Sequence, residues 1–158
     1  MTELSPENIN VSTWKIPSPL GIIGSHANGE FNGMTASWFT QVSMDPALIG
    51  VGIDNKSVTF SLMDQSEYFT LNMFSPEYTK VFVKFSKPAE YTDGFLNKEP
   101  IFLTENKVPV FENATVWFEL KTTQKIDFGT HTLFVGEIVD CKTLNPEERV
   151  AYMGDTRM

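Results

Sequence analysis

The chain has 158 residues, of which 41% are hydrophobic and 13% aromatic, and its formal net charge is −8. These values predict one globular domain over residues 1–158 and exclude a largely disordered chain. Nucleic acids and anionic membranes bind clustered lysine and arginine, so an acidic chain is expected to bind neither. An anionic cofactor in a local pocket is compatible with this charge.

Cellular location is constrained only weakly by the sequence. No apolar run approaches the roughly 20 residues that cross a bilayer. Residues 1–14 have no basic end and no apolar centre, so we expect no secretory signal. The single cysteine, Cys141, cannot form an internal disulfide and suits a reducing compartment. We therefore expect a cytoplasmic protein.

The first part of the chain predicts a β-hairpin. Residues 2–12 are polar and are expected to form a surface lead-in. Residues 20–27 read as a strand, and Asn28-Gly29 is a strong signal for a tight hairpin turn because both residues tolerate positive φ. The return strand is predicted over residues 30–42.

Side-chain alternation along that return strand would gather its hydroxyl groups on one face. One face is predicted to carry Met34, Ala36, Trp38 and Val42, and the other Thr35, Ser37, Gln41 and Ser43.

The middle of the chain predicts strands and short helices in turn. Strands are expected over residues 48–53 and 67–74, separated by a helix over 57–65 that Ser57 caps. A second helix is expected to begin at Ser75-Pro76 and to stop before Pro88. It would present Val81, Phe82 and Phe85 on one face, and residues 86–100 are rich in loop signals.

The last third predicts two long strands and a short helix. Residues 108–123 contain an aromatic-rich strand, residues 127–129 form a turn, and residues 131–141 form the next strand. A short terminal helix is expected over 146–151. Because strands dominate, the predicted fold class is mainly β: a closed or nearly closed antiparallel barrel, Greek-key-like, with short helical insertions.

Two polar clusters indicate a binding site. Thr35-Ala36-Ser37 combines small residues with hydroxyls, and the turn Asp54-Asn55-Lys56-Ser57 follows a buried strand. Small residues let a planar ligand approach the backbone, while hydroxyls and free N–H groups can bind a phosphate. The alternative interpretation is that these are ordinary surface hydroxyls and a solvated lysine.

Three motifs of the chain, the first of which contains Thr35-Ala36-Ser37, resemble those of the flavin reductase-like family, the FMN-binding split barrels. The pattern N-G-x-T-A-S occurs at residues 32–37 and V-S-x-D-P-P at residues 42–47, where Ala47 replaces the second proline. The third motif, G-T-H followed by an apolar pair and G-E-V, occurs at residues 129–138 with Ile138 in the valine position.

The resemblance implies FMN as cofactor, NADH or NADPH as co-substrate, and a split β-barrel. It implies that His131 contacts the flavin or the nicotinamide, although a histidine that pins a strand end is the alternative. The cofactor-binding residues that it implies are Asn32, Met34, Thr35, Ala36, Ser37, Trp38, Ser43, Asn55, Lys56, Ser57 and Thr59.

One departure from the family pattern concerns the phosphate. Many members carry a basic residue before a phenylalanine in the loop after the second helix, whereas this chain reads Asp93-Gly94-Phe95. A common flavin-phosphate cation is therefore missing at Gly94. Lys87 or Lys98 is the predicted replacement; the alternative is weaker affinity.

The resemblance predicts an NAD(P)H:flavin oxidoreductase that forms a homodimer and passes electrons to a protein acceptor or a flavin-dependent monooxygenase. The alternatives are a non-enzymatic FMN electron carrier like flavoredoxin, a flavin-storage module and, more distantly, a pyridoxamine-phosphate oxidase-like enzyme. Two histidines and one cysteine without ligand spacing predict no metal site.

Overall fold

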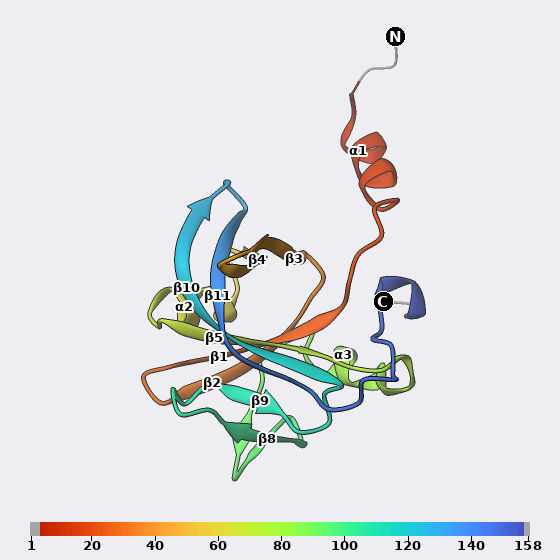
Figure 1. The fold of residues 1–158 in the computed structure, drawn as a ribbon. Coiled ribbons are helices and arrows are strands. Elements are labelled where there is room, and N and C mark those ends of the chain that lie inside the picture. Colours follow the sequence, from red (N-terminus) through yellow and green to blue (C-terminus); the bar gives the residue numbers. More distant parts are fainter. Residues whose placement is uncertain (1–3, 157–158) are drawn as a thin grey trace.

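The computed structural model describes residues 4–156 and consists of two antiparallel sheets with short helices (Figure 1). The larger sheet has seven strands in the order β2-β1-β5-β10-β11-β4-β3. Its strands are β1 Gly21–Ala27, β2 Glu30–Ala36, β3 Phe39–Met44, β4 Ala47–Asp54, β5 Tyr68–Met73, β10 Val116–Asp127 and β11 His131–Thr143. The predicted antiparallel, mainly β fold is thereby confirmed.

The smaller sheet has four short strands in chain order. They are β6 Tyr91–Thr92, β7 Phe95–Leu96, β8 Glu99–Leu103 and β9 Pro109–Phe111. In Figure 1, β8 and β9 lie below the larger sheet, on the side opposite the β3–β4 and β10–β11 hairpins.

The helices are short. They are α1 Pro6–Thr13, α2 Val58–Asp64, α3 Lys80–Lys84 and two 3₁₀ turns, η1 Pro76–Tyr78 and η2 Met153–Asp155. Ser57 caps α2 as predicted, since its hydroxyl accepts a hydrogen bond from Phe60 N at 3.0 Å. Among the described residues, no helix has the length and apolar character needed to cross a bilayer.

The return strand predicted over residues 30–42 is wrong as one strand. The chain leaves β2 at Ala36, passes through Ser37-Trp38 without strand structure, and enters β3 at the opposite edge of the sheet. A register shift between Gln41 and Ser43 further interrupts the alternation. The predicted common hydroxyl face is therefore lost, because a face is shared only within one continuous strand.

Three other local predictions differ from the structure. The polar lead-in contains helix α1, which Ser5 caps by accepting a hydrogen bond from Asn8 N at 3.2 Å. The strand predicted within residues 108–123 is divided into β9 and β10 by a turn at residues 112–114. The terminal helix predicted over 146–151 is absent, and η2 forms just beyond it.

The buried apolar side chains form two clusters. The α3 core lies between α3, the smaller sheet and one face of the larger sheet, and it is rich in phenylalanine; it includes Phe74, Phe82, Phe85 and Phe111. The barrel core lies within the larger sheet and against α2, and it includes Ile49, Val51, Ile53, Phe69, Leu71 and Phe134.

Candidate functional site

Trp38 and His131 form a ring pair at the point where the chain crosses between the sheet edges. The two ring centroids are 4.5 Å apart and the planes are inclined at 43°. Trp38 is held at its backbone, where its carbonyl accepts a hydrogen bond from Gly52 N at 2.8 Å. The indole is 60% exposed, so one side packs against the protein and the rest is available to a ligand.

His131 begins β11 and pairs with Asp54 at the end of β4. This pairing brings two of the predicted segments together, the G-T-H motif and the turn at residues 54–57. A hydroxyl–imidazole hydrogen bond of 2.9 Å links Thr130 Oγ1 with His131 Nδ1. His131 Nε2 makes no hydrogen bond within the described chain and can face a ligand.

Asn55 fixes the geometry of the turn. Its amide nitrogen donates to Asp127 Oδ1 at 3.2 Å and to the carbonyl of Gly129 at 3.0 Å. Its amide oxygen accepts from Thr132 Oγ1 at 2.6 Å, and its backbone N donates to the carbonyl of Thr130. The bonds that Asp127 accepts from Gly129 N and from Asn55 lower the pKa of its carboxyl. Asn55 therefore ties β4 to the β10–β11 turn.

The remainder of this turn leaves one free cation. Ser57 Oγ donates to the carbonyl of Asp54 at 2.7 Å, which uses the only proton of that hydroxyl. The backbone N of Lys56 donates to Asp54 Oδ1 at 2.8 Å, whereas the Lys56 ammonium group makes no hydrogen bond in the described chain. Lys56 is thus the group in this turn that can meet a phosphate.

Asn32 and Thr59 lie inside the protein. Asn32 Nδ2 donates to Thr59 Oγ1 at 3.0 Å, and Asn32 Oδ1 accepts from Ala89 N at 2.8 Å. Their exposed fractions are 3% and 0%. This bridge joins β2, α2 and the segment after α3, so both residues position the surrounding elements. The cofactor contacts predicted for them stay predictions.

Thr35 is likewise used by the fold. Its hydroxyl donates to the carbonyl of Phe82 at 2.7 Å and its backbone N to that of Phe85 at 2.9 Å. Of its neighbours, Ala36 is buried, Met34 is half-buried against the barrel core, and Ser37 has a half-buried hydroxyl that makes no hydrogen bond in the described chain.

The structure does not bring Ser43 to this cluster. Ser43 lies near the β3–β4 turn, five residues beyond Trp38, which is about 16 Å along a strand. The predicted role of Ser43 at the cofactor stays a prediction.

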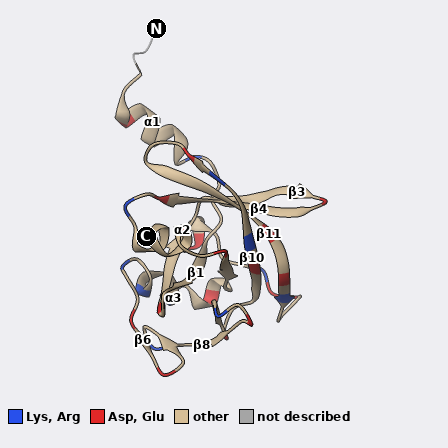
Figure 2. Cartoon of the chain, turned by 90° about the vertical axis from the view of Figure 1, so that its left-hand side faces the viewer, with Lys and Arg blue, Asp and Glu red and all other residues tan. Residues whose placement is uncertain are grey.

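A groove of about 820 Å³ beside α3 gathers three lysines, and we call it the lysine groove. Lys80, Lys84 and Lys87 line it together with Val83, Pro88, Glu90 and Asn97. Lys84 pairs with the buried Glu99 at 2.7 Å, which leaves the ammonium groups of Lys80 and Lys87 available. In the acidic chain drawn in Figure 2, this groove is a local basic site.

Sequence reasoning proposed Lys87 but missed Lys80 and Lys84. The sequence feature that could have indicated Lys80 and Lys84 is their i, i+4 spacing, which places both on one side of a helix. Gly94 lies in the β6–β7 turn with a φ of +87°, a conformation that L side chains rarely adopt. This turn geometry favours glycine at position 94.

Comparison with known proteins identifies a family and relatives that match most of the chain. Residues 13–157 match the family described as "Flavin reductase like domain". The ferric-chelate reductase (NAD(P)H) of Archaeoglobus fulgidus is 31% identical over 145 residues, which cover 88% of this chain and 83% of that protein. The stachydrine N-demethylase reductase subunit Stc3 of Rhizobium meliloti is 32% identical over 122 residues, or 77% of this chain. The chain spans about half, 52%, of Stc3.

A solved structure with the same fold is the FMN-binding protein from Thermus thermophilus with bound p-hydroxybenzaldehyde. It superposes with a TM-score of 0.71 at 27% identity, and the match covers 82% of this chain and 73% of that chain.

Proposed function

The chain belongs to the flavin reductase like family, and from this premise we propose that it is an NAD(P)H-dependent flavin reductase that binds FMN. The observation that carries the proposal is the ring pair of Trp38 and His131 beside the turn that holds Lys56. An exposed ring surface and a free cation next to each other suit a planar ring joined to a phosphate.

The phosphate end of FMN is assigned to lysines and not to the predicted hydroxyls. Thr35 and Ser57 donate their hydroxyl protons to backbone carbonyls, so neither can also donate to phosphate. Lys56, and Lys87 in the lysine groove, have ammonium groups without a partner in the described chain. Segment 85–89 is hydrogen-bonded to β2 at Asn32 and Thr35, which supports Lys87 as the replacement for the missing loop cation.

The ring end is assigned to the crossover between the sheet edges. Ser37 offers a free hydroxyl there, Ala36 adds little bulk, and Trp38 presents its exposed indole. The bound flavin would supply the hydride chemistry, so the chain needs no acid or base for that step. His131 would orient the nicotinamide or donate a hydrogen bond to the flavin from its free Nε2.

The same proposal includes a protein acceptor and a second copy of the chain. Stc3 is named as the reductase subunit of a demethylase, and a similar role here means delivering reduced flavin or electrons to a separate oxygenase. A homodimer is proposed because the exposed Trp38 and its apolar surroundings would be covered by a second copy. The net charge of −8 favours acceptors with a basic docking face.

The proposal is tested with the purified protein and three reductants. FMN is bound, excess flavin is removed, and NADH, NADPH and dithionite are added separately without oxygen. We expect at least one nicotinamide to bleach the flavin absorbance. If dithionite bleaches it and both nicotinamides fail at saturating concentration, the reductase is excluded and the FMN electron carrier takes its place.

A variant separates the role of His131 from binding. His131→Ala should slow reduction by the nicotinamide about tenfold, because 1.4 kcal/mol of lost orientation is a factor of ten. FMN should stay bound, since Lys56 and Lys87 are unchanged. Thr130→Ala keeps the imidazole but removes the hydroxyl bonded to its Nδ1, so it should slow reduction less than His131→Ala. Equal rates for wild type and His131→Ala would remove this residue from the reaction.

A further inference from the structure

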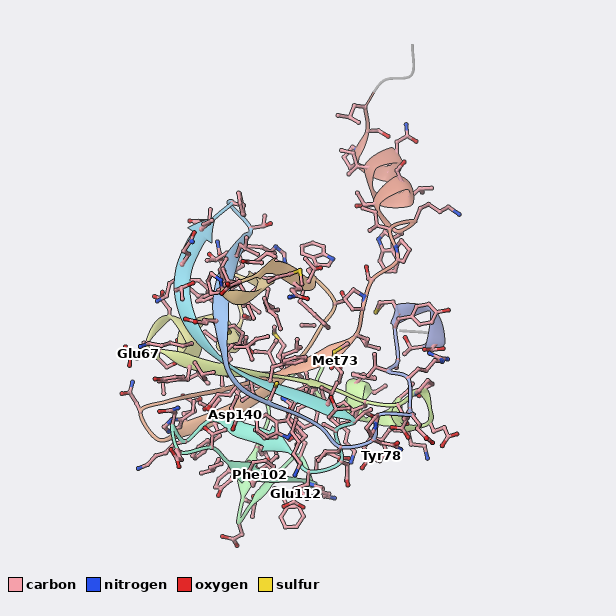
Figure 3. The ribbon with its side chains drawn as sticks, viewed as in Figure 1. Glu67, Met73, Tyr78, Phe102, Glu112 and Asp140 are labelled. Atoms are coloured by element: carbon pink, nitrogen blue, oxygen red, sulfur yellow. The ribbon has the colours of Figure 1, made fainter. Side chains whose placement is uncertain are left out.

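The N-terminal arm, defined as residues 4–16, stands away from the body of the protein. Figures 1 and 2, which differ by 90°, both show α1 beyond the sheets, and Figure 3 shows its side chains with no other element around them. None of the α1 residues is buried. An isolated helix of eight residues is unstable in water, because helix nucleation is costly and so few hydrogen bonds repay it. The helix therefore requires a surface to pack on.

The arm carries exposed apolar side chains. Val11, Trp14 and Ile16 are 67%, 74% and 64% exposed, and Leu4 is 79% exposed. The charged residues of the arm are only Glu7 and Lys15. With Ile9, which is 42% exposed, a tryptophan and four aliphatic side chains on one short segment form the kind of anchor that is buried at protein interfaces.

The body of the protein has an uncovered apolar groove of about 860 Å³. We call it the apolar groove; it is lined by residues 16–19 and 37–42 and by side chains of β4, β5, β10 and β11, among them Ile49, Leu71, Met73, Phe118, Leu133 and Ile138. Met73, labelled in Figure 3, belongs to β5. Several of these side chains, such as Met73 and Phe118, are partly buried extensions of the barrel core. The barrel core is therefore open to solvent along this groove.

Charge decides what kind of group the groove accepts. None of its lining residues is charged, and Figure 2 shows β3, which forms one wall, tan along its length. A phosphate would find no cation there, whereas the nearly uncharged arm matches the groove in polarity. The cofactor phosphate is assigned to lysines elsewhere, so the arm and the phosphate do not compete for the same groups; the arm and the flavin ring meet only at Ser37 and Trp38.

The arm is directed away from its own groove. It leaves the body at residues 16–19, which form the rim of that groove. Pro17 and Pro19 fix φ, and each proline disfavours helical backbone at the residue before it, so this connection is extended and stiff. The arm is about 25 Å long, from an eight-residue helix and five flanking residues, which is enough to reach across a neighbouring copy.

We propose that the arm of each chain docks into the apolar groove of a second copy and thereby completes the flavin site. Ser37 and Trp38 line the groove and also belong to the candidate site, so an arm seated there forms a wall that one chain lacks. This inference rests on the proposed homodimer. It adds that the two chains exchange their arms, which a homodimer formed through another surface would not do.

The test uses two full-length variants, both with the exposed Cys141 changed to serine. One carries Ser12→Cys on the arm, which keeps the Trp14 side chain, and the other Thr40→Cys on the groove. The variants are mixed, allowed to exchange subunits, and treated with a short bismaleimide. We expect a covalent heterodimer in the mixture and far less covalent dimer in either variant alone. A chain carrying both cysteines should also give intermolecular products.

Three results would overturn the exchange. The first is a mixture that gives no more covalent dimer than the separate variants. The second is a doubly substituted chain that cross-links only internally, which would seat the arm in its own groove. The third is loss of the capture when FMN is added, which would place the flavin ring in the groove. Sedimentation of the wild type distinguishes these failures from failure of the homodimer, and the flavin spectrum tests the proposed function independently.

The equilibrium between monomer and dimer gives a second measurement. Trp14→Ser should raise the dimer dissociation constant at least tenfold. Phe95→Ser replaces a 46% exposed aromatic residue on the smaller sheet, away from the arm and the groove, and should change it less than twofold. Equal effects of the two substitutions would contradict the docking of the arm.

Discussion

The two cores of this protein differ in how completely they are covered. The α3 core is enclosed by α3, the smaller sheet and the larger sheet, and its phenylalanines meet edge to face, as Phe74 does with Phe82 and Phe111. The barrel core is closed on the side of α2 but opens into the apolar groove. Every candidate contact to the flavin ring lies near the open side.

Buried polar groups are paired in the enclosed half of the molecule. Beside the α3 core, the buried carboxylate of Glu99 binds Lys84 at 2.7 Å and the hydroxyl of Tyr78 at 2.9 Å. Burial, followed by the interaction with Glu99, raises the pKa of Tyr78, so the phenol stays protonated and donates. At the groove, the Ser37 hydroxyl makes no hydrogen bond in the described chain. Next to α2, the Lys56 ammonium group is likewise without a partner among the described residues. Apolar packing is therefore complete around the α3 core and left open at the apolar groove, while free polar groups lie on the surface of both halves.

The largest effect expected from this comparison is on stability. Phe74→Ala should lower the free energy of unfolding by about 3–5 kcal/mol, because it leaves a cavity in an enclosed aromatic cluster. Trp38→Ala removes a larger side chain that is 60% exposed and should cost less than about 1 kcal/mol. Urea unfolding of the flavin-free proteins measures both, and equal losses would show that the open side is as tightly packed as the other.

The next effect is on cofactor affinity. Lys56→Met and Lys87→Met keep the apolar stem and remove the charge, and each should weaken FMN binding roughly ten- to a hundredfold, since a hydrogen bond to a charged group contributes about 1.5–3 kcal/mol. Riboflavin affinity should not change, because riboflavin lacks the phosphate. Lys121→Met, on the exposed face of β10, is the control. Calorimetry that finds wild-type FMN affinity in both variants would place the phosphate elsewhere.

A matched pair of hydroxyl substitutions separates folding from binding within the predicted motifs. Thr59→Val keeps the shape but leaves the buried Asn32 Nδ2 without an acceptor, so it should destabilise the protein by about 1–2 kcal/mol. Ser37→Ala removes a hydroxyl that bonds nothing in the described chain and should leave the melting temperature unchanged while weakening flavin binding. Identical melting temperatures for the two variants would contradict the buried bridge.

The smallest expected effect is a pH dependence at the β10–β11 turn. The folded pKa of Asp127 is lowered by the bonds from Gly129 N and Asn55. The stabilisation is therefore fully present above the unfolded pKa of about 3.9 and is lost as the pH falls through the folded value. Asp127→Ala should lower the melting temperature slightly at pH 7, and the difference from wild type should shrink near pH 3. Glu105→Ala, at an exposed carboxylate without a hydrogen bond in the described chain, should show no such change.

Local sequence signals determined the elements whose causes are local. Asn28-Gly29 forms the predicted hairpin turn, with φ of 52° and 78°. Ser57 caps α2, and the apolar spacing of Val81, Phe82 and Phe85 correctly predicted three buried side chains at α3. Turn residues, caps and apolar periodicity act within a few residues, so one sequence is enough to read them.

Tertiary structure decided which predicted site residues remain free. The hydroxyls of Thr35 and Thr59 looked available in the sequence, but their partners, Phe82 and Asn32, are distant along the chain. Equally, nothing near Trp38 in the sequence indicates that its ring meets His131, because that contact depends on the crossover at residues 37–38 and on the pairing of β11 with β4.

The strand-rich fold, its turns and caps, and the segments that carry the family motifs could therefore be read from the amino-acid sequence. The split of residues 30–42 between opposite sheet edges, the lysine groove beside α3 and the opening of the barrel core became visible only in the folded chain. Packing across the whole chain assigns partners to hydrogen-bond donors and apolar surface, and these partners are distant in the sequence. The hydrogen-bonding groups and the apolar surface that remain free for a ligand can be identified only once all the other contacts of the fold are known.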